Sequence, residues 1–256
     1  MEPIQSRKLA VLVFSGGQDS TTCLYWAIAQ GYAVHAVTMN YGQRHSREIE
    51  SARKIAELAG VDHEVIDVPM ILKGTSPLVS GADLEQYKDH ASLPGGLEKT
   101  FVPMRNQLFL TIAANRAYCL GTNILITGVC EEDYGGYPDC RQTFIDSLAE
   151  TCSRGTFNAD TGYDDGLKII TPLMKLTKKA TVELAMDLGS DCMEALAYSH
   201  TAYDGAYPPI GHDHATLLRA KGFEEAGVAD PLVLRAVGEG LMRLPTSVNY
   251  DKFRAI

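Results

Sequence analysis

The chain has 256 residues, of which 45% are hydrophobic and 21% are charged; this composition predicts a soluble globular protein with one large domain or a domain and an appendage. Its 23 basic and 32 acidic residues give a formal net charge of −9, which argues against nucleic acid as a partner, and no apolar run approaches the ~18 residues of a membrane span. A polar start unlike a secretory signal, and cysteines without Cys-x-x-Cys spacing, favour a cytoplasmic protein.

The first predicted element is a strand that ends in an anion-binding loop. An apolar run reaches Phe14, the sequence Ser-Gly-Gly-Gln-Asp-Ser occupies residues 15–20, and residues 24–29 have helical character. Glycines allow the backbone to approach an anion, and the start of a helix favours negative charge. An ordinary glycine-containing turn is the alternative. Without Gly-Lys-Ser/Thr or Gly-x-Gly-x-x-Gly, the loop is neither a Walker-type loop nor a dinucleotide-binding turn.

Strand and helix patterns then alternate along the chain. Residues typical of β-structure predict further strands at 33–41, 64–68, 123–129 and 168–173. Apolar residues at helical spacing predict helices at 46–60, 107–120, 144–152 and 177–188. With the first strand, this alternation predicts an α/β fold built on a parallel, five-stranded, doubly wound sheet. Ligands of such sheets bind beyond the carboxyl ends of the strands.

Two regions depart from this alternation. Residues 70–100 carry Gly, Pro, Ser and Asp with weak periodicity, and we interpret them as a flap over the site, with a plain surface insertion as the alternative. From residue 190 the alternation stops, and short helices are expected only at 214–223 and 232–244. We therefore predict an α/β domain over residues 1–189 and a small, mostly helical appendage over 190–256.

Charged residues occur near the predicted ligand edge. Arg105 and Asn106 precede a helix, and an arginine at the positive end of a helix favours an anionic partner over an ordinary surface role. The loop at 128–141 follows a strand and combines charges, tyrosines and glycines, which suit a planar, hydrogen-bonding ligand; a polar turn is the alternative. One of three lysines is a candidate phosphate ligand and the others are expected to be solvated, namely Lys175, Lys178 and Lys179.

The loop at 15–20 resembles the Ser-Gly-Gly-x-Asp-Ser loop of the PP-loop, or N-type, ATP pyrophosphatases, which split ATP into an adenylated substrate and pyrophosphate. Alone, it leaves tRNA-thiolating, NAD-synthesising and GMP-synthesising relatives open. Four further stretches are similar to the 7-cyano-7-deazaguanine synthases of queuosine biosynthesis, and they lie at 41–45, 101–106, 133–141 and 171–178. The resemblance runs from about residue 8 to 223 and implies an adenine nucleotide alpha hydrolase-like fold.

One departure from this family concerns its structural zinc, which four cysteines hold near the C-terminus. Alignment on the Thr201, Tyr203, Leu218 and Arg219 positions places residues without thiols at the cysteine positions, namely Ala202, Ile210, Asp213 and Thr216. The zinc site is therefore not carried over, and we expect a hydrophobic or hydrogen-bonded replacement. The alternative is a substitute metal site made by His200, His212, Asp213 and His214.

The resemblance implies an ATP-dependent carbon–nitrogen ligase that converts 7-carboxy-7-deazaguanine and ammonia to the nitrile, a precursor for tRNA modification. Adenylation turns a carboxylate oxygen into an AMP leaving group, ammonia then gives the amide, and a second adenylation allows elimination to the nitrile. The resemblance also suggests a homodimer. Two alternatives stay open: a diverged enzyme that stops at the amide or joins the acid to another amine, and a nucleotide-binding subunit without turnover.

Such catalysis depends on positioning and charge neutralisation. The resemblance assigns ATP and its pyrophosphate to the loop and its flanks, through Phe14, Ser15, Gly16, Gly17, Gln18, Asp19, Ser20, Thr21 and, for adenine, Met39. Asp19 is also the candidate Mg²⁺ ligand. The expected catalytic residues are Asp19, Ser20, Arg105 and Lys178, and the expected substrate-binding residues are Asp133, Tyr137, Asp139 and Arg141. Cys140 as a nucleophile is an unneeded alternative.

Overall fold

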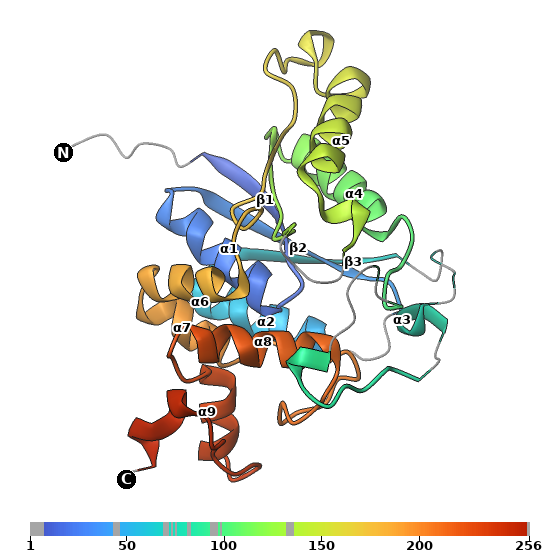
Figure 1. Ribbon diagram of the computed structural model, residues 1–256. Helices are drawn as coiled ribbons and strands as arrows, with labels where there is room; N and C mark the ends of the chain where they lie inside the picture. Colours follow the sequence, from blue (N-terminus) through green and yellow to red (C-terminus); the bar gives the residue numbers. More distant parts are fainter. Residues whose placement is uncertain are drawn as a thin grey trace, which may run out of the picture.

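The computed structural model describes residues 8–42, 47–68, 72, 74, 76–80, 83–92, 97, 99–131 and 136–254. Within these residues, five parallel strands form one sheet in the order β3-β2-β1-β4-β5. They are β1 (Leu9–Val13), β2 (Ala33–Asn40), β3 (Asp62–Asp67), β4 (Ile124–Ile126) and β5 (Lys168–Ile170). The predicted α/β fold with a five-stranded parallel sheet is confirmed (Figure 1).

Helices cover both faces of this sheet (Figure 1). One face carries α1 (Gln18–Ala29), α2 (Arg47–Ala59), α6 (Lys178–Asp187) and α7 (Ser190–Leu196). The other carries α4 (Arg105–Cys119) and α5 (Gln142–Gly155). α8 (His214–Glu225) packs against α6, and α9 (Pro231–Gly238) extends away from the sheet. Shorter helical segments are α3 (Pro77–Ser80), His90–Ser92, Pro138–Cys140, Ala159–Thr161 and Val248–Phe253.

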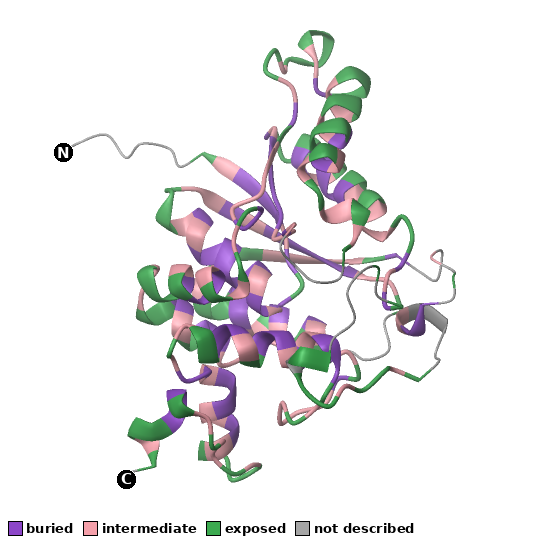
Figure 2. Ribbon diagram, viewed as in Figure 1, coloured by how far each residue is buried: buried purple, intermediate pink, exposed green. Residues whose placement is uncertain are grey.

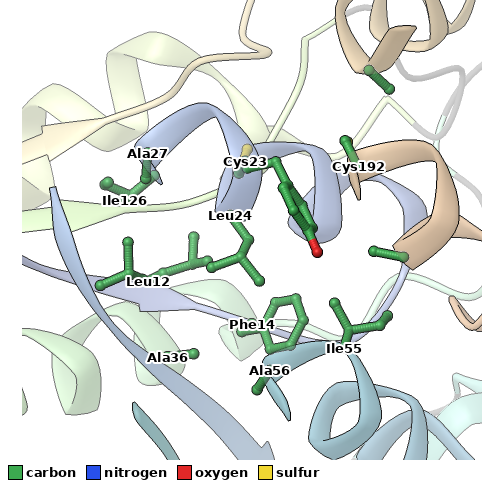
Figure 3. Packing of buried hydrophobic residues seen from close by; sticks show 14 of the residues in the cluster. Leu12, Phe14, Cys23, Leu24, Ala27, Ala36, Ile55, Ala56, Ile126 and Cys192 are labelled. Atoms are coloured by element: carbon green, nitrogen blue, oxygen red, sulfur yellow. The ribbon is translucent and has the colours of Figure 1, made fainter. Parts of the chain in front are cut away.

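The two-residue period of β1 explains why the core has two halves. Leu12 and Phe14 lie in the cluster that includes α1 and α2, and Val11 lies in the cluster on the opposite face. Figure 3 shows Leu12 and Phe14 near Leu24 of α1 and Ile55 of α2. The central strands are buried on both faces, whereas the outer faces of the helices are exposed (Figure 2). This explains why β1 is a continuous apolar run.

The order of the strands places a crevice beside β1. β2 and β3 lie on one side of β1, and β4 and β5 lie on the other. The connections after β1 and after β4 therefore leave the sheet at a point where the strand order reverses, which is where open α/β sheets bind ligands. Residues 15–20, which run from the turn after β1 into the first turn of α1, lie at this point.

The structure corrects several predicted boundaries. α1 begins at Gln18 rather than at residue 24, because its first polar turn is buried by tertiary packing. β4 and β5 end at Ile126 and Ile170, short of the predicted residues 129 and 173. The helix predicted to reach residue 244 ends at Gly238, shortly before Gly240 takes a left-handed φ of 72°.

The structure also contains α7, a helix absent from the predicted pattern of the C-terminal region. Its Cys192, Ala195 and Leu196 are fully buried in the core cluster that contains α1, so tertiary contacts stabilise this short helix. The boundary at residue 190 stays a prediction. So does the flap over 70–100, which lies partly outside the described residues. Among the described helices, none has the length and apolarity needed to cross a membrane.

Candidate active site

The loop at 15–20 is held in shape by its own hydrogen bonds and by α2. Ser20 Oγ accepts from Ser15 N at 3.3 Å and donates to the Gly17 carbonyl at 3.2 Å. Gly16 has a φ of 75°, and a Cβ there would lie 2.6 Å from Ala52 N. Because neither the angle nor the space suits a side chain, only glycine fits at this position. The loop therefore packs directly against the α2 backbone.

The start of α1 faces a cation from α6. Lys178 Nζ lies 2.6 Å from Asp19 Oδ2, and the two side chains are only 15% and 25% exposed. Thr177 caps α6 by accepting from Ala180 N, and Gly222 of α8 packs against Lys178. Of the three predicted lysines, Lys178 is the one beside the loop. The other two form surface ion pairs, Lys175 with Glu131 and Lys179 with Glu183.

A buried ion pair holds a third segment against the loop. Both Asp230 carboxylate oxygens accept from the Arg219 guanidinium, at 2.7 and 2.8 Å. Arg219 also donates to Ser199 Oγ at 2.7 Å and to Thr201 Oγ1 at 2.9 Å. Between these two residues, His200 N donates to the Gly16 carbonyl at 2.9 Å. The C-terminal region thus supplies one wall of the site.

Two cavities meet at the loop. The first, of about 280 Å³, extends toward Lys178 and Arg219, and the second, of about 350 Å³, lies over the ends of β1, β2 and β4. Their shared wall consists of Ser15, Asp19, Ser20, Cys130, Tyr137, Cys140 and Tyr203. Gln18 Nε2 in the first cavity, although buried, has no hydrogen-bond partner within the described residues, which suits a donor kept for a ligand.

The second cavity contains Arg105, the first residue of α4. Met104 is the one non-glycine residue with positive φ in the described part of the chain, at 65°, and it precedes Arg105 at the start of α4. Burial works to lower the pKa of Arg105, but Tyr41, Tyr203, Tyr137 and Asp139 together hold that pKa above its ordinary value. The guanidinium therefore stays charged among aromatic and acidic groups.

Asp139 lies near this arginine on the loop after β4. Burial raises the pKa of Asp139, and the charge of Arg105 partly offsets that effect. Its Oδ1 is buried with no hydrogen-bond partner among the described residues. Asn106 Nδ2 donates to the Asp139 carbonyl at 3.2 Å and to Cys140 Sγ at 3.3 Å. These contacts connect the start of α4 to the loop.

The structure brings most predicted site residues to these cavities. The first is lined by Ser15, Gly17, Gln18, Asp19, Ser20, Tyr137, Arg141 and Lys178, and the second by Phe14, Met39 and Arg105 in addition to the shared wall. Thr21, Gly16 and Asp139 line neither cavity. Thr21 is fully buried behind the loop, and Gly16 packs against α2. Asp133 lies outside the described residues.

The sequence profile described as "Queuosine biosynthesis protein QueC" matches residues 9–227, which is most of the chain. The chain belongs to the QueC family. A 7-cyano-7-deazaguanine synthase from Gloeobacter violaceus is 52% identical over 227 residues, covering 88% of this chain and 95% of the relative. One from Chromobacterium violaceum is 47% identical over 239 residues, covering 91% and 97%. A 4-thiouridine synthetase in complex with RNA and ATP has a TM-score of 0.48 at 17% identity, covering 91% and 53%.

Of the four positions at which the family resemblance implies zinc cysteines in this QueC chain, two form a helix cap. Asp213 Oδ1 accepts from Thr216 N at 3.1 Å, and Thr216 Oγ1 donates to Asp213 Oδ2 at 2.7 Å, which caps α8. Ala202 is buried, whereas Ile210 is 62% exposed. Among the described residues, no three His, Cys, Asp or Glu side chains gather as a metal would require. Ala202 and Ile210 offer no ligand atom, and Asp213 and Thr216 bond each other, so these four residues do not fit a structural zinc.

Several residues of the site were missed by sequence reasoning. Tyr41, Glu48, Phe109 and Tyr203 line the second cavity, and His200 lines the first. Tyr41 lies in a stretch that resembles the QueC family, and this resemblance could have identified Tyr41 as a site residue. Glu48 occupies one of the polar positions of an amphipathic helix, where a functional carboxylate cannot be told from a solvated one by spacing alone.

Proposed function

We propose that this QueC-family chain is a 7-cyano-7-deazaguanine synthase that uses two ATP to convert 7-carboxy-7-deazaguanine and ammonia to the nitrile, AMP and pyrophosphate. The observation that carries this proposal is the pairing of Lys178 with Asp19 beside the loop at 15–20, between two adjoining cavities. One site with room on both sides of a phosphate-binding loop suits a reaction that joins ATP to a second substrate.

ATP binds in this proposal with its phosphates on the loop. Backbone amides at the start of α1, the Ser15 and Ser20 hydroxyls and the buried Gln18 amide are the donors for pyrophosphate. Lys178 and Arg105 neutralise the charge of the phosphates and of the carboxylate that attacks the α-phosphorus. Met39 and Phe14, at the ends of β2 and β1, border the adenine.

Magnesium is the metal that ATP chemistry of this kind implies, and Asp19 is the residue that would hold it. A carboxylate oxygen is the ligand that Mg²⁺ prefers, and Asp19 lies in both cavities, so the donor chemistry fits. When bound, the ion would neutralise phosphate charge.

The deazapurine acid binds in this proposal between Arg105 and the loop after β4. Tyr137 supplies a stacking face and Arg141 a donor. Asp139, which lies behind the cavity lining with its Oδ1 unpartnered among the described residues, is the proposed acceptor. Asp133 keeps its proposed role in base recognition. Ammonia must approach the adenylated carbonyl carbon from above or below the plane of the acyl group, and AMP leaves when the tetrahedral adduct collapses to the amide. We also propose a cytoplasmic homodimer, which size-exclusion chromatography with light scattering would test.

One incubation tests this function against its rivals. The protein is mixed with ATP, Mg²⁺, ammonium and 7-carboxy-7-deazaguanine, and AMP and product mass are measured. The nitrile with two AMP per product supports the proposal. An amide with one AMP would identify an enzyme that stops half-way, and an adduct with another amine would identify a different ligase. A binding subunit would release no AMP.

A further inference from the structure

Glu48 is an acidic residue in the second cavity to which the proposed mechanism gives no role. It lies in the first turn of α2, and its backbone carbonyl is close to Gly16 of the phosphate loop. Of the described residues that line this cavity, only Asp19, Glu48 and Arg105 carry charge, and Asp19 is paired with Lys178. Because the proposed function already gives roles to Asp19 and Arg105, Glu48 is the charged group of this described lining that has no role, and Arg105 is the cation that shares the cavity with it.

The carboxylate of Glu48 is poorly satisfied by the protein. Among the described residues no hydrogen bond contributes to the pKa of this carboxylate, and Arg105 acts on it only through its charge. Burial raises the pKa of Glu48, and the charge of Arg105 only partly offsets that effect. A partly buried carboxylate without donors is costly, and the cost falls when a ligand brings N–H groups to it.

Aromatic rings complete the surroundings of this pair. The Tyr41 and Phe109 rings both line the cavity, with centroids 5.1 Å apart, and Phe109 projects from the helix that begins with Arg105. Tyr137 and Tyr203 lie on the shared wall. An acceptor, a donor and flat apolar faces in one cavity suit a planar heterocycle with N–H groups and an anionic substituent.

We infer that Glu48 is a specificity-determining residue that accepts hydrogen bonds from the ring N–H and exocyclic amine of a guanine-type substrate, while Arg105 binds the neighbouring carbonyl and carboxylate oxygens. This inference rests on the proposed function and deepens it. In 7-carboxy-7-deazaguanine the amine and ring N–H are adjacent donors, and the carbonyl and carboxylate follow along the same side of the molecule. Glu48 and Arg105 present the matching order of acceptor and donor.

A substrate analogue without the exocyclic amine tests this role. The kcat/KM of the unaltered protein is measured for 7-carboxy-7-deazaguanine and for the 7-carboxy-7-deazahypoxanthine analogue. We expect a preference of about 10- to 100-fold for the guanine type, the value of one charge-assisted hydrogen bond. In Glu48→Gln this preference falls toward unity and the KM for ATP is unchanged. Glu57→Gln, on an exposed position of the same helix, is the matched control and keeps the preference.

Two outcomes would overturn the inference: a preference that survives in Glu48→Gln, or a higher KM for ATP in that variant, which would assign Glu48 to the adenine. If Glu48→Gln does not fold, as judged by its thermal melt, absence of any preference in the unaltered protein is itself decisive. Calorimetric binding of both ligands, without ATP, separates this inference from the proposed function. If the protein prefers the guanine-type ligand in binding but does not turn it over, the role of Glu48 is supported and only the proposed reaction is contradicted.

Discussion

Lys178 Nζ lies 2.6 Å from Asp19 Oδ2, so the first residue of α6 contacts the first turn of α1 across 159 residues of sequence. The pair is largely shielded from solvent and lies where the two cavities meet. A carboxylate and an ammonium group that hold each other in place are preorganised for the proposed phosphate binding, and such preorganisation is a major source of catalysis.

Removal of either partner should therefore disable nucleotide chemistry. We expect Asp19→Ala to abolish AMP release and Lys178→Met to lower kcat/KM for ATP by about 10²- to 10³-fold. Lys179→Met is the matched control, because the Lys179 side chain is 48% exposed and, within the described residues, forms an ion pair with Glu183 on the surface of α6. Steady-state AMP production measures the effect. Unchanged turnover in Asp19→Ala would mean that the site lies elsewhere.

A methyl group at Gly16 should damage the loop more than one at Gly31. Both glycines have positive φ, at 75° and 83°, so alanine costs about 1–2 kcal/mol of strain at either. At Gly31 the added Cβ would meet nothing within 4 Å, whereas at Gly16 it would lie 2.6 Å from Ala52 N. Urea unfolding should show the greater loss for Gly16→Ala, together with loss of AMP release. Equal losses would contradict this.

The Arg219–Asp230 pair should be worth more to folding than an exposed pair. Both side chains are about 97% buried, so Arg219→Met leaves an isolated carboxylate and should cost about 3–5 kcal/mol in urea unfolding. Arg154→Met, in an exposed pair with Glu150, should cost less than about 1 kcal/mol. The double variant Arg219→Met/Asp230→Leu should recover part of the loss. A double variant as unstable as the sum of both single variants would contradict this.

Asp213 should make the free energy of unfolding fall as the pH rises. A carboxylate in an ion pair, whose pKa is lowered, has the opposite effect. Burial raises the pKa of Asp213 above 3.8, although Thr216 donates to it. The folded state therefore binds more protons than the unfolded state, and this contribution to stability, complete below pH 3.8, is lost as pH rises through the folded pKa.

Asp213→Asn isolates this effect because asparagine also caps helices well. Relative to the unaltered protein, the variant should gain stability as the pH is raised from about 4 to about 7. The measurement is the difference between the two unfolding free energies across that range. Parallel curves would show that Asp213 does not titrate differently in the two states.

The protein should hold no stoichiometric zinc. Asp213 and Thr216 hydrogen-bond to each other where relatives are expected to carry cysteines, and neither Ala202 nor Ile210 offers a ligand. We expect chelator treatment to leave the thermal melt unchanged and mass spectrometry to find zinc well below one ion per chain. Tightly held zinc at one per chain would instead favour the histidine alternative.

The sheet was predictable from sequence because its signals are local. β1 is an apolar run, and α2 has a clear polar and a clear apolar face. The alternation of such strands and helices was enough to predict that the strands are parallel. α7 was not predictable, because its seven residues become a helix only when Cys192 and Leu196 are buried against α1. Short helices of this kind depend on tertiary contacts.

The same division holds for the site. The loop at 15–20 and Lys178 belong to compact stretches of sequence, and the structure brings them together. Glu48 and Tyr203 join the second cavity from α2 and from the segment after α7. The orientation of a helix on the sheet decides which of its polar residues face a cavity. The spacing of residues in the sequence does not predict that orientation.

The short segment at 199–201 has a consequence for how the molecule responds to its ligands. On one side His200 N bonds the Gly16 carbonyl, and on the other Ser199 and Thr201 bond Arg219, which holds Asp230 at the start of α9. A nucleotide that orders the loop would therefore also tighten the contacts of α9. If a bound nucleotide tightens these contacts, thermodynamic reciprocity requires that a change tightening them from the α9 side raises nucleotide affinity by the same factor.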